Sequence, residues 1–343
     1  MVQKIFITIV AILTFLSILP LLKSGFPPTH DGEYHVVRFY EFDKALRDGN
    51  FYPRWAPDLN YGYGVPILNF VYPLPNYLAS FLHSFGVSFI DSFKLNMILA
   101  SFVGAIFFYL WTKEFFGRLG GLISSIFYTF SPYHFLDIYI RGSVGEVWAL
   151  AFFPVFLFSI TKFVKEGQLK FAILSSIFLS LIIFSHNILA LMFFPFALSY
   201  IFFLIIRSKD PKYLILNTFY IILLSLGLSS VFWLPALIER EYVRGLGVFD
   251  YSFHFPEFYE LLIPSWGSGF SGGSLQNQLS FQIGIANLLA FFVAPITALI
   301  LKKKKDNNFK IIFFFIGWFI LIFFLMLKVS MPIWENIPFM NYF

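Results

Sequence analysis

The stretch at 298–315, ALILKKKKDNNFKIIFFF, decides how this chain folds. Four consecutive lysines, Lys302–Lys305, stand in a short polar gap between two long apolar runs. Cytoplasmic segments of membrane proteins retain an excess of Lys and Arg. The gap therefore predicts a membrane protein that makes one of its cytoplasmic turns at 302–310.

The same charge asymmetry extends along the whole chain. Fourteen of the 24 Lys and Arg, but only four of the 19 acids, fall in five segments that we assign to the cytoplasm. These segments are Lys4 and the gaps 113–118, 162–170, 207–212 and 302–310. Every histidine and the other acids fall in the remaining gaps. We therefore expect a cytoplasmic N-terminus and an extracytoplasmic face that carries the chemistry.

The composition agrees with a membrane protein. With 58% hydrophobic residues, 13% charged residues and a mean hydropathy of +0.76, the chain is not a water-soluble globule. Its basic residues orient the chain in the cell membrane and do not indicate nucleic-acid binding. The absence of cysteine excludes disulfides and thiolate catalysis.

A membrane-spanning helix needs about 20 apolar residues. The sequence predicts an all-α, polytopic helix bundle with about nine spans, the first of them uncleaved. The spans are 4–22, 91–112, 119–137, 145–163, 170–185, 187–206, 213–237, 281–301 and 310–330.

The segment 66–86 is apolar enough to be a tenth span. Its prolines, Pro66, Pro73 and Pro75, interrupt helical hydrogen bonding. A crossing here would also place Lys302–Lys305 outside the cell. We predict instead that 66–86 lies on the outer membrane face.

The chain reads as a single membrane domain, 1–343. The first span, 1–22, precedes a large external loop at 23–90 that carries juxtamembrane helices. Six spans at 91–238 lead to a second external loop at 239–280, which is rich in glycine and aromatic residues. Two spans at 281–330 precede 331–343, the expected start of a further external segment of a longer chain. Long loops in compact bundles are usually functional or disordered, and this aromatic content argues against disorder.

The densest group of ionisable residues follows the first span, at His30, Asp31, Glu33 and His35. An Asp-x-Glu pair can supply a general base or hold a divalent cation, Mg²⁺ or Mn²⁺. If the segment is helical, Asp31 and His35 share a face. Alternatively, Asp31 is simply the N-cap of that helix.

Further polar residues fall at predicted outer ends of spans. Arg141 either pairs with Asp137 at i,i+4 or binds an anionic head group, and Glu146 follows it. His186 is either a packed, hydrogen-bonded residue or part of the same outer site. In the second loop, Trp266 is suited to stacking on a sugar ring.

Several short motifs occur in order along the chain. They are Thr29-His30-Asp31-Gly32-x-Tyr34-His35, Tyr52-Pro53-Arg54-Trp55, Gly62-Tyr63-Gly64-x-Pro66, Tyr72-Pro73-x-Pro75, Arg141-Gly142-x-x-x-Glu146, His186-Asn187 and Ser280-Phe281-Gln282-x-Gly284. Together they resemble the membrane proteins named for a 6-pyruvoyl-tetrahydropterin-synthase-related domain, and the overall layout resembles the GT-C superfamily of glycosyltransferases.

The GT-C resemblance implies an inverting enzyme that takes a sugar from a polyprenyl-phosphate donor at the non-cytoplasmic face. Asp31 and Glu33 would match the acidic motif of the first loop, which deprotonates the acceptor or holds a metal. The expected substrate-contacting residues are His30, His35, Arg54, Arg141, Glu146, His186 and Trp266.

Two other functions remain open. A lipid or polysaccharide transporter should place ionisable groups near the middle of the membrane, in broken helices. A non-catalytic assembly protein would not require Asp31, Glu33 and Arg141 to converge. The clustering of ionisable groups at one interface favours the enzyme.

The charge asymmetry gives a testable topology. We expect a cysteine at Lys304 to be labelled only from the cytoplasm and a cysteine at Trp266 only from outside. The naturally cysteine-free chain is a clean background for accessibility labelling. Labelling of both positions from the same side would contradict the topology.

Overall fold

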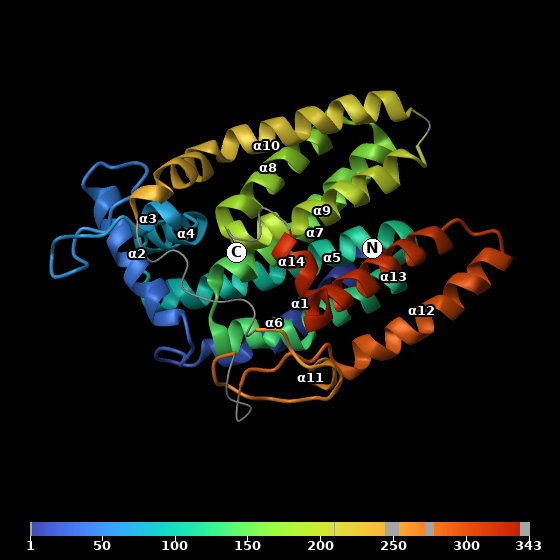
Figure 1. Ribbon diagram of the computed structural model, residues 1–343, viewed down its shortest axis with the longest axis horizontal. Coiled ribbons are helices and arrows are strands. Elements are labelled where there is room, and N and C mark those ends of the chain that lie inside the picture. Colours follow the sequence, from blue (N-terminus) through green and yellow to red (C-terminus); the bar gives the residue numbers. More distant parts are fainter. Residues whose placement is uncertain (1, 209, 244–253, 272–277, 337–343) are drawn as a thin grey trace. The chain divides into compact units, whose positions relative to one another are not determined.

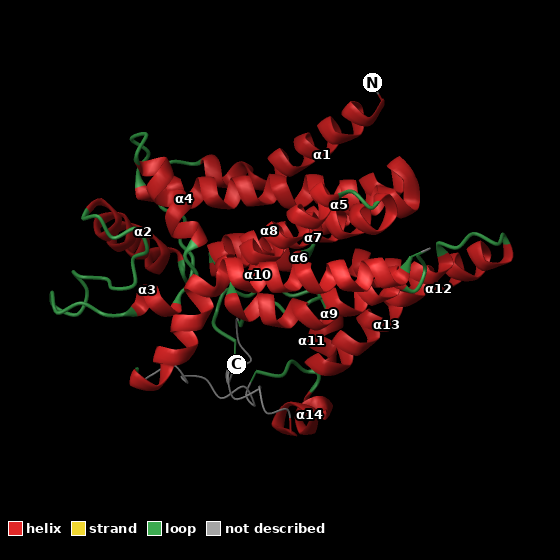
Figure 2. Cartoon of the chain, turned by 90° about the horizontal axis from the view of Figure 1, so that it is seen from above, coloured by secondary structure: helices red, strands yellow, loops and turns green. Residues whose placement is uncertain are grey.

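The computed structural model describes residues 2–208, 210–243, 254–271 and 278–336. These residues are helical or irregular, with two isolated β-bridges, Ala56 to Val65 and Gly269 to Gln278 (Figures 1 and 2). The all-α prediction is therefore confirmed for the described part of the chain. Within it, seven helices are long and apolar enough to cross a membrane, and Leu169–Ser185 is a shorter apolar helix.

The elements follow one another along the chain. They are α1 (Val2–Ile18), η1 (Leu19–Leu22), α2 (Gly32–Arg47), α3 (Ile67–Phe70), α4 (Leu74–His83), α5 (Phe89–Thr129), α6 (Pro132–Leu136), the π-helix η2 (Asp137–Arg141), α7 (Val144–Glu166), α8 (Leu169–Ser185), α9 (Asn187–Ile205), α10 (Pro211–Glu239), η3 (Arg240–Tyr242), α11 (Phe258–Leu262), α12 (Ile285–Lys303), α13 (Phe309–Met326), η5 (Lys328–Ser330) and α14 (Met331–Asn336).

The chain divides into two compact units. Unit 1 comprises Met1–Thr129 and Asp137–Glu241, and unit 2 comprises Phe130–Leu136 and Tyr242–Phe343. In unit 2, α12 packs against α13, where the rings of Phe291 and Phe319 stack at a centroid distance of 4.1 Å. The residues Arg244, Gly272 and Gly273 of the second predicted loop, and 337–343, lie outside the described residues.

Helix α7 is the centre of unit 1. It packs against α5, α8 and α9, while α1 packs against α5, and α10 against α8. In the most apolar 18-residue stretch of α7, 72% of the residues are buried, compared with 28% in the corresponding stretch of α1 and 22% in that of α10. Helix α7 is therefore surrounded by protein, whereas α1 and α10 leave most of their apolar surface for lipid.

Polar side chains join the helices inside unit 1. Trp111 of α5 donates its indole N–H to the Tyr200 hydroxyl of α9 at 2.8 Å, and Thr161 of α7 lies 2.6 Å from the same hydroxyl. Trp148 of α7 donates to Asn96 of α5 at 2.8 Å. Such bonds contribute to helix association in lipid, because apolar side chains gain little by leaving it.

Helix α5 consists of two antiparallel helical segments, the first and second legs, which meet at Gly117. Gly117 has φ 69° and ψ −174°, a conformation that ends the first leg and reverses the chain. The Ser125 hydroxyl then donates to the carbonyl of Ala105 at 2.7 Å, and Phe108 stacks on Tyr128 at 4.7 Å. A straight helix would separate residues 20 apart by about 30 Å. The two predicted spans 91–112 and 119–137 thus correspond to these legs.

The predicted span 119–137 is too long, because the helix ends at Thr129. Ser131 precedes Pro132, and a residue before proline is disfavoured in the α conformation. The boundary at His186, between the predicted spans 170–185 and 187–206, is a true break: His186 has φ −163° and ψ 108°, so α8 and α9 are separate helices.

The segment 66–86 holds the short helices α3 and α4, of four and ten residues. Ten helical residues rise about 15 Å, half of the hydrocarbon thickness. Neither helix of this segment is therefore long enough to cross the bilayer, and its place on the outer membrane face stays a prediction. Helix α4 packs against α2 and α5, and Phe42, Ala56 and Leu68 form a small core in the same loop. The first loop thus contains packed helices, as predicted, and their position at the membrane surface stays a prediction.

Two glycine substitutions should have opposite effects. A Cβ at Gly117 or at Gly227 of α10 would meet no atom within 4 Å, so packing does not distinguish them. The conformation of Gly117 is nearly confined to glycine, and Gly117→Ala should cost about 1–3 kcal/mol of stability. Gly227 lies inside a helix, and Gly227→Ala should add about 1 kcal/mol. Thermal unfolding in detergent measures both, and equal shifts would contradict the hairpin.

Candidate functional site

Two backbone hydrogen bonds join the residues at the start of α2 to the π-helix η2. The N–H of His30 donates to the carbonyl of Ile140, and that of Asp31 to the carbonyl of Arg141, both at 2.8 Å. Gly142, with φ +68°, and Gly32 permit this approach, because a Cβ on either would overlap the Thr29 hydroxyl. The structure therefore brings Asp31 and Arg141, 110 positions apart, to the same place.

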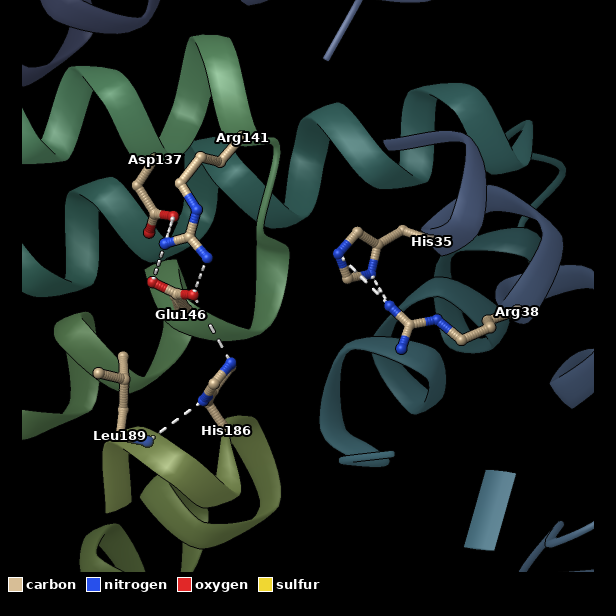
Figure 3. Close-up of polar contacts among 7 residues, drawn as sticks. All are labelled: His35, Arg38, Asp137, Arg141, Glu146, His186 and Leu189. Atoms are coloured by element: carbon tan, nitrogen blue, oxygen red, sulfur yellow. Dashed lines mark hydrogen bonds and ion pairs between the residues drawn. The ribbon is translucent and has the colours of Figure 1, made fainter. Parts of the chain in front are cut away.

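Arg141 makes a two-pronged ion pair with Glu146. Its Nη1 lies 2.5 Å from Oε2, and its Nη2 contacts Oε1 (Figure 3). Asp137 is more distant, with Oδ1 at 3.5 Å from Nη1. Both carboxylates are buried, with side-chain exposures of 7% for Glu146 and 0% for Asp137. The predicted Asp137 pair is thus secondary to a pair with Glu146.

His186 joins the same group. As the N-cap of α9, its Nδ1 accepts the N–H of Leu189 at 3.2 Å (Figure 3). An Nδ1 that accepts must be unprotonated, so the proton of the neutral ring is on Nε2, which lies 3.7 Å from Glu146 Oε1. Burial lowers the pKa of His186 to about 4, against the opposing effect of Glu146. His186 is therefore a neutral, packed cap that also faces the ion pair.

Helix α2 presents a polar face to this region. His35 is buried, with 1% exposure, and its Nδ1 lies 2.5 Å from Nη2 of Arg38. Arginine only donates, so the imidazole accepts and is neutral. Burial lowers the pKa of His35 well below its usual value, and Arg38 lowers it further. Asp31, His35 and Arg38 are spaced i, i+4 and i+7, as expected for one helix face.

Tyr72 packs near His186 of one group and near Arg38 of the other. Its ring centroid is 5.0 Å from that of His186, and the Arg38 guanidinium carbon is 5.5 Å from it. A Cβ on Gly145 would overlap the Tyr72 ring, so the glycine allows Tyr72 to pack on the first turn of α7. Tyr72 therefore connects the polar face of α2 with the Arg141–Glu146 pair.

The Asp31 carboxyl is half-buried beside these charges. Burial raises the pKa of Asp31, Arg141 and Arg38 oppose the rise, and Glu146 adds to it. Although Asp31 is the N-cap of α2, its side chain makes no capping hydrogen bond. A carboxyl that does not serve the helix is available for other chemistry.

The remaining predicted site residues make other contacts or belong to unit 2. Glu33 is exposed on α2, two positions from Asp31, and residues at i and i+2 do not face each other on a helix. Arg54 lies 3.9 Å from Glu239, which also accepts from Asn69 at 2.9 Å. Trp266 belongs to unit 2 and is 69% exposed. His30 is partly buried, and its backbone joins η2.

The predicted metal pair does not fit one ion. Asp31 and Glu33 do not share a helix face, and the carboxylate of Glu146 is occupied by Arg141. Among the described residues, no group of three or more His, Cys, Asp or Glu is placed to hold a metal ion. We therefore assign no chemical step to a metal.

Two members of the site, Arg38 and Tyr72, were not predicted from the sequence. The signal for Arg38 is its i+7 spacing from Asp31, which continues the face that Asp31 and His35 begin. Tyr72 belongs to the Tyr72-Pro73-x-Pro75 motif, but nothing in that motif indicates which helix the ring contacts.

The low pKa of His186 makes stability depend on pH. Between about pH 6.5 and pH 4 the unfolded chain binds this proton and the folded chain does not, so stability falls as the pH falls. His186→Asn keeps a good N-cap and removes the titration. The loss of stability on acidification should be smaller in the variant, by up to about 3 kcal/mol at pH 4. Denaturant unfolding at pH 7 and pH 4 measures it, and equal losses would contradict the assignment.

Comparison with known proteins identifies a relative of this chain. An uncharacterized protein of Lactococcus lactis subsp. cremoris (strain MG1363) is 25% identical over 240 residues, which cover 68% of this chain and 39% of the relative. The chain thus spans well under half the length of that protein. No solved structure matches.

The model of a protein family covers most of the chain. The 6-pyruvoyl-tetrahydropterin synthase related domain, described as a membrane protein, matches residues 68–343. The match includes Arg141, Glu146 and His186, and begins after the α2 residues of the site. The chain therefore belongs to the family of membrane proteins with a 6-pyruvoyl-tetrahydropterin synthase related domain.

Proposed function

We propose that this chain is the membrane part of a GT-C-type glycosyltransferase. It transfers a sugar from a polyprenyl-phosphate donor to an acceptor at the non-cytoplasmic face of the cell membrane. The observation that carries the proposal is the position of the half-buried Asp31 carboxyl. The hydrogen bond from the Asp31 N–H to the Arg141 carbonyl holds this residue near the guanidinium groups of Arg141 and Arg38. The carboxyl makes no capping hydrogen bond to α2.

The proposed topology has nine crossings, with α5 counted as two. An N-terminus in the cytoplasm then puts the start of α2, the turn before α7 and the break at His186 on the outer face. The contacts among Asp31, Arg141, Glu146 and His186 support this, since an alternating chain must bring those points to one end. The pairing of Glu114 with Lys162 and Lys165 supports a common opposite end.

In the proposed reaction, the Asp31 carboxylate takes the proton of an acceptor hydroxyl. The hydroxyl oxygen attacks the anomeric carbon, and the bond from that carbon to the phosphate oxygen breaks with inversion. The phosphate leaves with the bonding electrons, and nearby positive charge stabilises it. A raised pKa suits Asp31 to this role, because a general base works best when its pKa approaches the working pH.

Asp31→Asn should abolish most of the transfer, because a positioned general base contributes about 10²- to 10⁴-fold in rate. The measurement is sugar transfer from a polyprenyl-phosphate-sugar by the full-length parent protein. The variant should unfold at the wild-type temperature, since the carboxylate makes no capping bond. Glu33→Gln is the matched control, because Glu33 is exposed on the same helix.

Full activity of Asp31→Asn would refute the catalytic role. A loss of stability in Asp31→Ala without loss of activity in Asp31→Asn would instead identify Asp31 as a helix cap.

A further inference from the structure

We propose that the guanidinium of Arg38, packed on Tyr72, binds the phosphate group of an anionic lipid carrier. This deepens the proposed function and rests on it only for the identity of that lipid as the sugar donor. The phosphate site itself is inferred from the surroundings of Arg38.

Arg38 differs from most other cations of the first loop and its neighbourhood. Most of these cations have a carboxylate partner within 4 Å: Lys44 with Asp58, Arg47 with Asp43, Arg54 with Glu239, Lys94 with Asp91 and Arg141 with Glu146. Among the described residues, Arg38 has no carboxylate within that distance, and its Nε is buried without a hydrogen-bond partner. A buried donor without a partner is costly, so the guanidinium gains from a rearrangement that gives this nitrogen an acceptor.

The neighbours of Arg38 do not supply that anion. Nη2 contacts a neutral His35 ring, and the guanidinium carbon lies over the Tyr72 ring at 5.5 Å. Both hold the guanidinium in place, and neither carries a negative charge. The planar fork of arginine matches the oxygens of a phosphate, which it can bind through two parallel hydrogen bonds.

The position of Arg38 relative to Asp31 fits an inverting displacement. The two residues are seven positions apart, so their Cα atoms are about 10 Å apart along the axis of α2. That leaves room for a sugar between a base at Asp31 and a leaving phosphate at Arg38. Arg141 is less suited to the phosphate, because both of its Nη atoms are engaged by Glu146.

Binding measurements on the purified chain in detergent test the proposal. The probes are geranylgeranyl monophosphate, the matched alcohol geranylgeraniol, and inorganic phosphate. The wild type should bind the phosphate ester more tightly than either other probe. Arg38→Gln should weaken ester binding about 10- to 100-fold, because that is the loss in affinity expected when one hydrogen bond to a charged group is removed. Arg47→Gln, on the same helix, should bind as the wild type does.

Ester binding by Arg38→Gln at wild-type affinity would overturn the proposal. Equal affinity for inorganic phosphate and the ester would overturn the assignment of the ligand as a lipid phosphate. The site would then be one for free phosphate. If Arg38→Gln does not fold, Arg38→Lys decides: it keeps the charge but loses the fork, and should bind the ester several-fold more weakly. Wild-type affinity of Arg38→Lys would then overturn the proposal.

The two proposals fail in distinguishable ways. If Arg38→Gln loses ester binding but the full-length parent transfers no sugar, the phosphate site stands and the glycosyltransferase proposal falls. If the parent transfers sugar and Arg38→Gln still binds the ester, the phosphate contact lies elsewhere.

Discussion

The buried ion pair between Arg141 and Glu146 holds together the segments that carry the polar residues of unit 1. Removing one member of such a pair would leave an uncompensated charge, at a cost of about 3–5 kcal/mol, so each residue constrains the segment that carries it. Arg141 ends the π-helix, and its carbonyl receives the N–H of Asp31; Glu146 lies in the first turn of α7 and faces His186. Three segments distant in sequence are therefore joined at one point, and the arrangement of α2, α7 and α9 follows from it.

Much of the architecture can be read from the sequence, because lipid imposes simple rules. The apolar segments of the sequence predicted long apolar helices that the described residues form, including the reversal in α5. The prolines of 66–86 correctly indicated that this segment does not form one long helix. The sequence also predicted a single outer site that includes Asp31, Arg141, Glu146 and His186, and the structure brings these four residues together.

The details of the site were less accessible, and the reasons are local. A regular helix would pair Asp137 with Arg141, but this turn is a π-helix and α7 starts again at Val144, which brings Glu146 to the guanidinium. The capping role considered for Asp31 depends on side-chain geometry, and the side chain makes no such bond. The contact of Tyr72 with Arg38 and His186 depends on the absence of a side chain at Gly145, which no local pattern reveals.

The hairpin in α5 has a consequence for the surrounding bilayer. Its second leg runs from Arg118 to Thr129 and rises about 18 Å, and α8, with 17 residues, rises about 26 Å. Both are shorter than a hydrocarbon core of about 30 Å, and α8 ends beside His186. A bilayer accommodates such hydrophobic mismatch by thinning. A bilayer that thins around helices of this length would bring lipid head groups and water closer to the polar residues near His186 than longer helices would allow.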